Sequence, residues 1–221
     1  MSARIREPHP WLLRGVLVLV VLVVTGLGIA LAYNSWKSST LKSPGHLPRY
    51  NSVSPFRMTE RSGRQVTEKD LRGNIWLANF IFTECPGICK ATSAQFEQLQ
   101  KMLGRTRSVK LVSFSVDPET DTPEVLARYA DSLKAEPDRW LFLTSGNERE
   151  IIDFSQKVMQ LPLSRNPEER VPLDGKMLHS SKFVLVDSRG VIRGQYDGLG
   201  PEALPKILQD IGFLMREEGL K

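Results

Sequence analysis

The apolar residues of the chain fall into one long run near its start and a series of shorter runs after it. Residues 15–32 (GVLVLVVLVVTGLGIALA) contain no charge. Extended by the apolar residues 11–13, a helix of this length just spans a bilayer core of about 30 Å. Trp11 and Tyr33 bracket the run, as expected for aromatic side chains at a membrane interface. The pattern predicts one amino-terminal transmembrane helix.

The charges around this run indicate its orientation. Arg4, Arg6 and Arg14 precede it, and a short basic amino end tends to stay in the cytoplasm while the rest of the chain crosses the membrane. A cleaved signal peptide is the alternative, because residues 30–32 (ALA) resemble a processing site, but the apolar run is longer than in most signal peptides. The amino end lacks the Ser- and Arg-rich stretch of a transit peptide. We therefore expect a bacterial inner membrane protein with its carboxyl-terminal domain in the periplasm or outside.

Beyond the predicted anchor, the pattern changes to that of a linker and one globular domain. Residues 34–52 are polar, contain Ser, Pro and Gly, and show no periodicity, as in a tether. The predicted organisation is a cytoplasmic segment at 1–13, a transmembrane anchor at 14–33, a linker at 34–52 and a domain at 53–221.

The domain alternates strand-like and helix-like segments. Residues 74–82 and 109–116 are nearly continuous apolar runs, which are typical of strands buried on both faces of a sheet. Thr122-Pro123 is a typical helix start. The order βαβαβαββα predicts an α/β fold with a central mixed sheet and helices on both faces. The expected elements are strands at 74–82, 109–116, 140–143, 182–187 and 191–196, and helices over 88–103, from 123, around 151–159 and from 201.

The charge of the chain excludes one class of partner. The 221 residues carry a formal net charge of +5, with a pI near 9.3. The basic residues are scattered among acidic ones, without a basic stripe and interleaved aromatics, so a nucleic acid partner is not expected. The positive balance suits a surface near anionic lipid headgroups.

The chain contains only two cysteines, Cys85 and Cys89, at the junction of a predicted strand and a predicted helix. If residues 88–103 are helical, their Cα atoms lie about 6 Å apart, which permits a disulfide or shared ligation of one metal ion. The helix N-terminus and the charge of Lys90 favour the thiolate. A plain structural disulfide is the alternative, although closing so short a loop constrains the unfolded chain little.

One of the three histidines is a candidate ligand. His9 and His46 precede the predicted domain, whereas His179 lies where a long proline-bearing loop enters the strand at 182–187. Two thiolates and one imidazole form a soft trigonal set that suits Cu(I), with room for a fourth contact to Cu(II). Spacing alone does not bring His179 to the cysteines; only the fold can do so.

Three motifs in order resemble one known family. They are FIFTECPGIC at residues 80–89, SVDPETDTP at 115–123, and His179 ahead of FVLVD at 183–187. Together they resemble the SCO/SenC family of membrane-anchored, thioredoxin-like copper proteins, over about residues 53–218. One departure is Lys90, where many members carry proline.

The resemblance implies a fold, a metal and partners. It implies a thioredoxin-like domain in which Cys85, Cys89 and His179 bind copper, as Cu(I) or Cu(II). Family members help to assemble the CuA centre of cytochrome c oxidase and also reduce its cysteines. The implied partners are subunit II of the oxidase, through its CuA domain, and a thiol reductant or copper donor protein.

Two functions of different classes follow. The first is a copper metallochaperone in which His179 completes the ligand set. The alternative is an enzyme, a membrane-anchored thiol-disulfide oxidoreductase or thiol peroxidase that uses Cys85 and Cys89 as a redox pair without metal. A redox sensor is a third and weaker interpretation. The acidic loop with Asp117, Glu119 and Asp121 is interpreted as turn and helix-cap chemistry rather than as support for the site or as a docking element.

Overall fold

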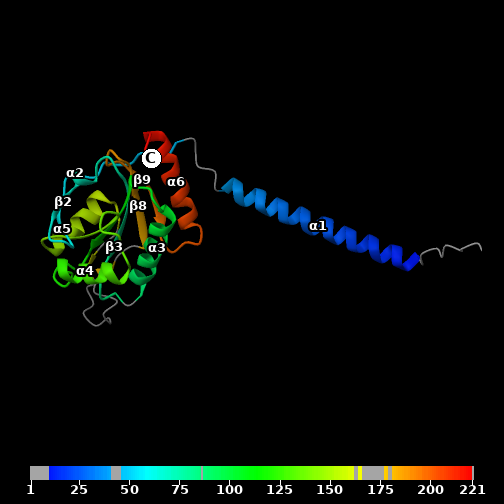
Figure 1. Cartoon of the computed structure of the whole chain (residues 1–221), viewed down its shortest axis with the longest axis horizontal. Coiled ribbons are helices and arrows are strands. Elements are labelled where there is room, and N and C mark those ends of the chain that lie inside the picture. Colours follow the sequence, from blue (N-terminus) through cyan, green and yellow to red (C-terminus); the bar gives the residue numbers. More distant parts are fainter. Residues whose placement is uncertain are drawn as a thin grey trace, which may run out of the picture. The chain divides into compact units, whose positions relative to one another are not determined.

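The computed structural model describes residues 10–40, 46–85, 87–161, 164–165, 177–178 and 181–220 (Figure 1). The chain divides into two compact units, Met1–Lys42 and Ser43–Lys221. The first unit contains helix α1 (Pro10–Thr40), in which large apolar side chains between Leu17 and Leu31 are more than half exposed. Within the described residues, no helix has both the length and the hydropathy that a membrane crossing requires. The transmembrane helix expected at 14–33 therefore stays a prediction.

The second unit is built on a seven-stranded sheet with the strand order β2-β1-β5-β4-β3-β8-β9. Strands β3, β4 and β5 are parallel, and the other pairings are antiparallel. The predicted mixed sheet is thus confirmed. The strands are β1 (Arg57–Glu60), β2 (Gln65–Thr67), β3 (Ile75–Ile81), β4 (Val109–Ser115), β5 (Trp140–Thr144), β8 (Lys182–Val186) and β9 (Ile192–Asp197), and a separate ribbon joins β6 (Ser164–Arg165) to β7 (Met177–Leu178).

Helices cover both faces of this sheet, as predicted. On one face, Phe96 of α3 (Ile88–Leu103) packs against Phe183, with ring centroids 4.7 Å apart, and Tyr129 of α4 (Pro123–Ser132) packs against Phe142. On the other face, Phe154 packs against Phe114 of β4, with centroids 4.9 Å apart. The helices are α2 (Glu68–Leu71), α3 (Ile88–Leu103), α4 (Pro123–Ser132), α5 (Glu148–Asp153), the π-helical turn η1 (Phe154–Val158) and α6 (Ala203–Glu218).

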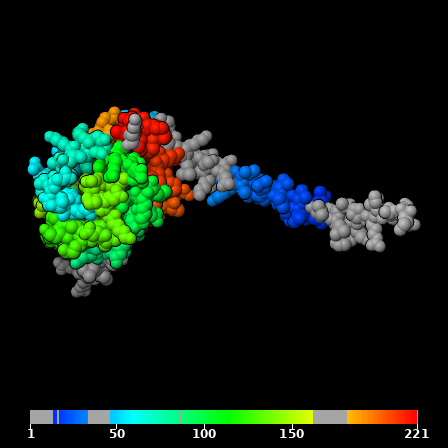
Figure 2. Space-filling model, viewed as in Figure 1, coloured from blue at the N-terminus to red at the C-terminus, as the bar shows by residue number. Residues whose placement is uncertain are grey.

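Local sequence explains where the central elements begin and end. All seven residues of β3 are buried, so its continuous apolar run matches a strand covered on both faces. Helix α4 begins as the Thr122-Pro123 pair predicts, because the Thr122 side chain accepts the Val125 backbone N–H. Figure 2 shows the segment around residues 50–70, in cyan, at one margin of the domain surface, which agrees with β2 as an edge strand.

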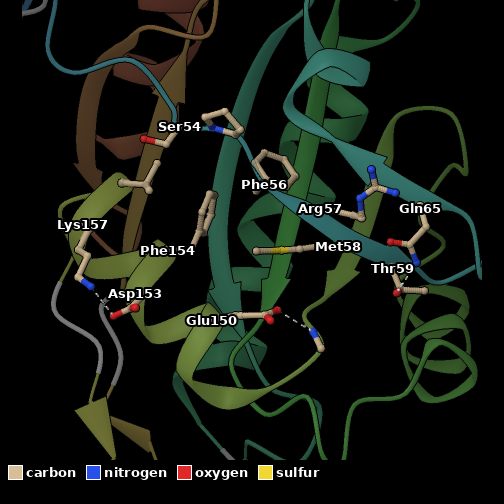
Figure 3. A pocket seen from close by; sticks show the side chains of 13 residues that line it. Ser54, Phe56, Arg57, Met58, Thr59, Gln65, Glu150, Asp153, Phe154 and Lys157 are labelled. Atoms are coloured by element: carbon tan, nitrogen blue, oxygen red, sulfur yellow. Dashed lines mark hydrogen bonds and ion pairs between the residues drawn. The ribbon is translucent and has the colours of Figure 1, made fainter.

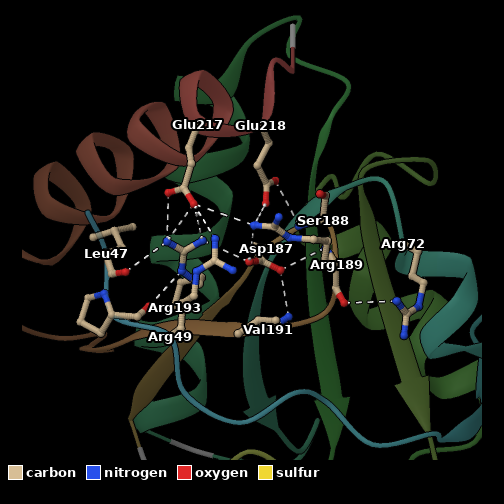
Figure 4. Close-up of polar contacts among 11 residues, drawn as sticks. Leu47, Arg49, Arg72, Asp187, Ser188, Arg189, Val191, Arg193, Glu217 and Glu218 are labelled. Carbon is tan, nitrogen blue, oxygen red and sulfur yellow. Dashed lines mark hydrogen bonds and ion pairs between the residues drawn. The ribbon is translucent and has the colours of Figure 1, made fainter. Parts of the chain in front are cut away.

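A buried arginine fastens the segment ahead of β1 to the domain (Figure 4). The Arg193 guanidinium donates to the carbonyls of Leu47 and Pro48, and it pairs with Asp187 at 3.1 Å and Glu217 at 3.0 Å. Leu47 is itself buried. Because these partners come from three separate parts of the sequence, the packed part of the chain begins upstream of residue 53.

Candidate metal and thiol site

Cys85 and Cys89 lie at the junction where β3 leads into α3. Neither cysteine is in a disulfide, and they are 3% and 0% exposed. The Cys85 backbone N–H donates to the Phe82 carbonyl at 3.2 Å. The Cys89 backbone N–H donates to the Cys85 sulfur at 3.4 Å. The sulfur of Cys85 therefore lies over the first turn of α3, and the expected proximity of the two residues is confirmed.

The environment of Cys89 differs from the sequence prediction. Burial raises its pKa far above the ordinary value of 9.0, and the hydrogen bond and charge of Cys85 and the charge of Asp121 act in the same direction. The prediction that the helix N-terminus and Lys90 favour the thiolate is therefore wrong for Cys89. Its side chain faces the core, where desolvation outweighs the helix dipole, while Lys90 is exposed to solvent.

A buried carboxylate lies next to the loop that carries the cysteines. Asp121 is 1% exposed, and it accepts hydrogen bonds from the hydroxyls of Thr83 and Ser115, each at 2.6 Å, and from the Thr83 backbone N–H at 3.2 Å. Burial raises its pKa. The cap of α4 is Thr122, so turn and cap chemistry does not account for Asp121.

A tyrosine reaches the site from α4. The Tyr129 hydroxyl lies 3.0 Å from the Ser93 hydroxyl, one helical turn beyond Cys89. Burial raises the pKa of Tyr129, the Ser93 hydrogen bond opposes this, and the charges of both cysteines raise it further. No local signal in the sequence identifies Tyr129 as a neighbour of the cysteines.

His179, the third predicted ligand, lies outside the described residues. Among the described residues, no three His, Cys, Asp or Glu side chains are grouped as metal ligands. Leu178 of β7 directly precedes His179, and the first described residue after it is Ser181. The Ser181 hydroxyl donates to Asp197 at 3.1 Å, and its carbonyl accepts the Gly198 N–H at 3.0 Å. Ser181 is thereby held at the start of β8.

The sheet topology determines which edge Ser181 occupies. Strand β8 runs antiparallel to β3, with Ala78 opposite Val184 and Trp76 opposite Val186. The start of β8 therefore lies at the edge where β3 ends and the Cys85 loop begins. Residues on these two segments are far apart in sequence but share this edge of the sheet.

A second feature is a groove on the opposite face of the sheet (Figure 3). It has a volume of about 820 Å³, and Phe56, Met58 and Phe154 form its apolar floor. Neither Cys85 nor Cys89 lines it. The groove is thus separate from the cysteine site, and nothing at the groove indicates a reactive group.

The fold and the thiol pair define the class of protein: a thioredoxin-like domain with two reduced cysteines where strand β3 leads into helix α3. Its sequence matches the model of the SCO1/SenC family over residues 45–214. The chain belongs to the SCO1/SenC family. It is 34% identical over 165 residues to the SCO1 protein homolog of Bacillus subtilis (strain 168), an alignment that covers 74% of this chain and 83% of that protein.

Solved structures agree with this assignment. A SCO1/SenC family lipoprotein from Bacillus anthracis str. Ames has a TM-score of 0.69 and 30% identity, covering 77% of this chain and 99% of that one. BsSco, described as a Sco family member with a disulfide switch, has a TM-score of 0.66 and 32% identity, covering 79% and 97%. Bradyrhizobium japonicum ScoI with copper bound has a TM-score of 0.62 and 25% identity, covering 74% and 99%. The predicted family and thioredoxin-like fold are confirmed.

Proposed function

We propose that this protein is a copper metallochaperone that binds copper through Cys85, Cys89 and His179. In this proposal it delivers the ion to the CuA site of cytochrome c oxidase subunit II, reduces the cysteines of that site, or does both. The observation that carries the proposal is a pair of neighbouring cysteines, not joined in a disulfide, at the sheet edge where β8 begins. The family includes copper-bound proteins and members described as oxidase assembly proteins.

The chemistry of the donor set fits copper. Thiolate sulfur is a soft ligand that suits Cu(I), and imidazole suits both copper oxidation states. The Cys89 N–H donates to the Cys85 sulfur, so the backbone fixes this sulfur before any metal arrives. A thiol must lose its proton to bind the ion. Since burial raises the pKa of Cys89, binding costs more free energy as the pH falls.

The role of His179 is supported by its place in the sequence. It precedes Ser181 by two residues, and Ser181 lies at the same sheet edge as the Cys85 loop. Two residues of extended chain reach about 7 Å. This short reach from Ser181 supports His179 as the third ligand of the proposed site.

The location is part of the proposal. We take residues 14–33 as an uncleaved anchor that holds the domain in the periplasm of a bacterium, where a thiol reductant and a copper donor would meet it. The support is the uncharged run at 15–32 and the exposed apolar side chains of α1. Fractionation and protease accessibility of intact spheroplasts test this location. A domain protected until the inner membrane is broken contradicts it.

The second candidate is a metal-free thiol-disulfide oxidoreductase. The observation in its favour is that both cysteines are reduced and close enough for the Cys85 sulfur to accept the Cys89 N–H. A relative is described as having a disulfide switch. This function needs Cys85 and Cys89 but not His179.

One titration separates the two candidates. The reduced full-length chain in detergent is titrated with Cu(I) against a chromogenic chelator, beside His179→Ala and the matched control His46→Ala, in which an exposed histidine is removed. The metallochaperone predicts one tightly bound Cu(I), at least tenfold weaker binding in His179→Ala, and no change in His46→Ala. Binding no tighter than in the double variant with Cys85→Ser and Cys89→Ser contradicts the proposal.

A further inference from the structure

We infer that Asp121 is a positioning residue for the sulfur pair, acting through Thr83 on the loop that carries Cys85. The inference rests on the proposed function, because it describes how the protein prepares that same site. It concerns a residue of β4's trailing loop, 36 positions from Cys85 in sequence.

The first argument is the cost of burying this carboxylate. Asp121 is 1% exposed, and no described Lys or Arg forms an ion pair with it. A buried ionised carboxylate without a countercharge is expensive, and only hydrogen bonds offset that cost. Asp121 receives them from neutral donors on two elements, Thr83 and Ser115. A carboxylate with so large a desolvation cost indicates a role beyond packing.

The second argument is where the donors lie. Thr83 contributes both its N–H and its hydroxyl to Asp121, and it precedes Cys85 by two residues. The Cys85 N–H in turn donates to the Phe82 carbonyl. The turn from residue 82 to Cys85 is thus held both by the hydrogen bonds of Thr83 to Asp121 and by its own internal hydrogen bond. This turn determines where the Cys85 sulfur meets the N–H of Cys89.

The third argument is the chemistry of replacement. A carboxylate accepts hydrogen bonds only, through two oxygens, whereas an asparagine amide has one accepting oxygen and adds two donors. In Asp121→Asn the new donors face the Thr83 N–H or the Ser115 hydroxyl. A buried donor then lacks an acceptor, and the Thr83 turn loses its fixed position.

The test measures how readily the two thiols form a disulfide. The full-length chain in detergent is equilibrated at pH 6 with mixtures of reduced and oxidised glutathione. The two cysteine thiols are oxidised to one disulfide while one glutathione disulfide is reduced to two thiols. Dithiol and disulfide are both uncharged when the thiols hold their protons. The equilibrium constant therefore reports the proximity of the sulfurs more than the charge of Asp121.

We expect Asp121→Asn to lower this equilibrium constant at least tenfold, which makes the midpoint potential about 30 mV less negative. Thr83→Val should act in the same direction, while Thr83→Ser, which keeps the hydroxyl, should stay near wild type. The matched control is Glu119→Gln, an exposed residue of the same loop, which should change the constant less than twofold. If Asp121→Asn does not fold, as judged by circular dichroism, the comparison of Thr83→Val with Thr83→Ser tests the inference instead.

The inference is overturned if Asp121→Asn matches Glu119→Gln, or if Thr83→Val and Thr83→Ser behave alike. Failure of the proposed function gives a different result: the wild-type chain binds no Cu(I), while the glutathione equilibrium still responds to Asp121 and Thr83. The two outcomes are therefore distinguishable.

Discussion

The backbone N–H of Cys89 points at the sulfur of Cys85, 3.4 Å away. This contact exists because α3 begins at Ile88 and turns its first exposed amide groups toward the end of β3. Cys85 therefore lies against the N-terminus of a helix, while Cys89 lies in the first turn of that helix with its side chain fully buried. Two cysteines four residues apart have different environments.

The first prediction concerns Cys89 and alkaline pH. Burial raises the pKa of Cys89 above its ordinary value of 9.0, so above pH 9 the unfolded chain releases this proton while the folded chain retains it. The stabilising contribution is complete below pH 9 and declines as the pH rises. We expect the free energy of unfolding under reducing conditions to fall by up to about 1.4 kcal/mol per pH unit above pH 9.

Urea unfolding of wild type and Cys89→Ala between pH 8 and pH 10 measures this slope. Cys89→Ala should lose most of this pH dependence of the free energy of unfolding, whatever its stability at pH 8. Tyr196 and Tyr129 also have raised pKa values, but their ordinary value is 10.0, so their effects begin higher. Equal slopes in the two proteins would show that Cys89 titrates normally in the folded state.

The second prediction concerns the buried guanidinium. Arg193→Ala leaves Asp187 buried without its partner, and it removes the donors to the Leu47 and Pro48 carbonyls. Breaking a buried ion pair from one side costs about 3–5 kcal/mol. We expect a loss of this size in urea unfolding, together with faster tryptic cleavage after Arg49.

The matched control is Arg189→Ala. Arg189 also approaches Asp187, at 3.7 Å, but its side chain is 54% exposed, so the expected loss is below about 1 kcal/mol. Similar losses in the two variants would contradict the claim that the buried Arg193 stabilises the fold more than the exposed Arg189.

The third prediction concerns the glycine beside Ser181. A Cβ on Gly198 would lie 2.6 Å from the Ser181 carbonyl oxygen and from the Phe183 ring. Gly198→Ala must therefore displace the start of β8, at a cost of about 1–3 kcal/mol. Because His179 enters through this segment in the proposed site, Cu(I) affinity should fall as well.

Gly212→Ala is the control for this change. Its Cβ would meet only Arg216, at 3.6 Å, within helix α6. Alanine favours a helix more than glycine does, so stability should rise slightly and copper binding should not change. A Gly198→Ala protein with wild-type stability and affinity would disprove the tight contact.

The sequence predicted well those elements whose pattern is local. The strand expected at 74–82 is β3 (Ile75–Ile81), and the helix expected at 88–103 is α3 with the same bounds. A continuous apolar run and a helical spacing of apolar residues are patterns among neighbouring residues, so the strand and the helix could both be predicted without a structure. The helix expected around 151–159 instead changes to a π-helical turn after Asp153, for which the apolar spacing gave no signal.

Long-range partnerships could not be predicted. Asp121 meets Thr83 across 38 residues, and Arg193 reaches Leu47 across 146. A charged residue in a sequence is expected at the surface, and only its folded partners make burial possible. The pKa of Cys89 was mispredicted for the same reason, since the helix dipole is a local feature and desolvation is not.

The most direct test of the central claim is X-ray absorption at the copper edge of the Cu(I)-loaded, full-length chain, compared with His179→Ala. The account predicts a first coordination shell of two sulfur atoms and one imidazole nitrogen, with the nitrogen contribution absent in the variant. A wild-type spectrum that contains sulfur alone and is unchanged by His179→Ala would contradict it.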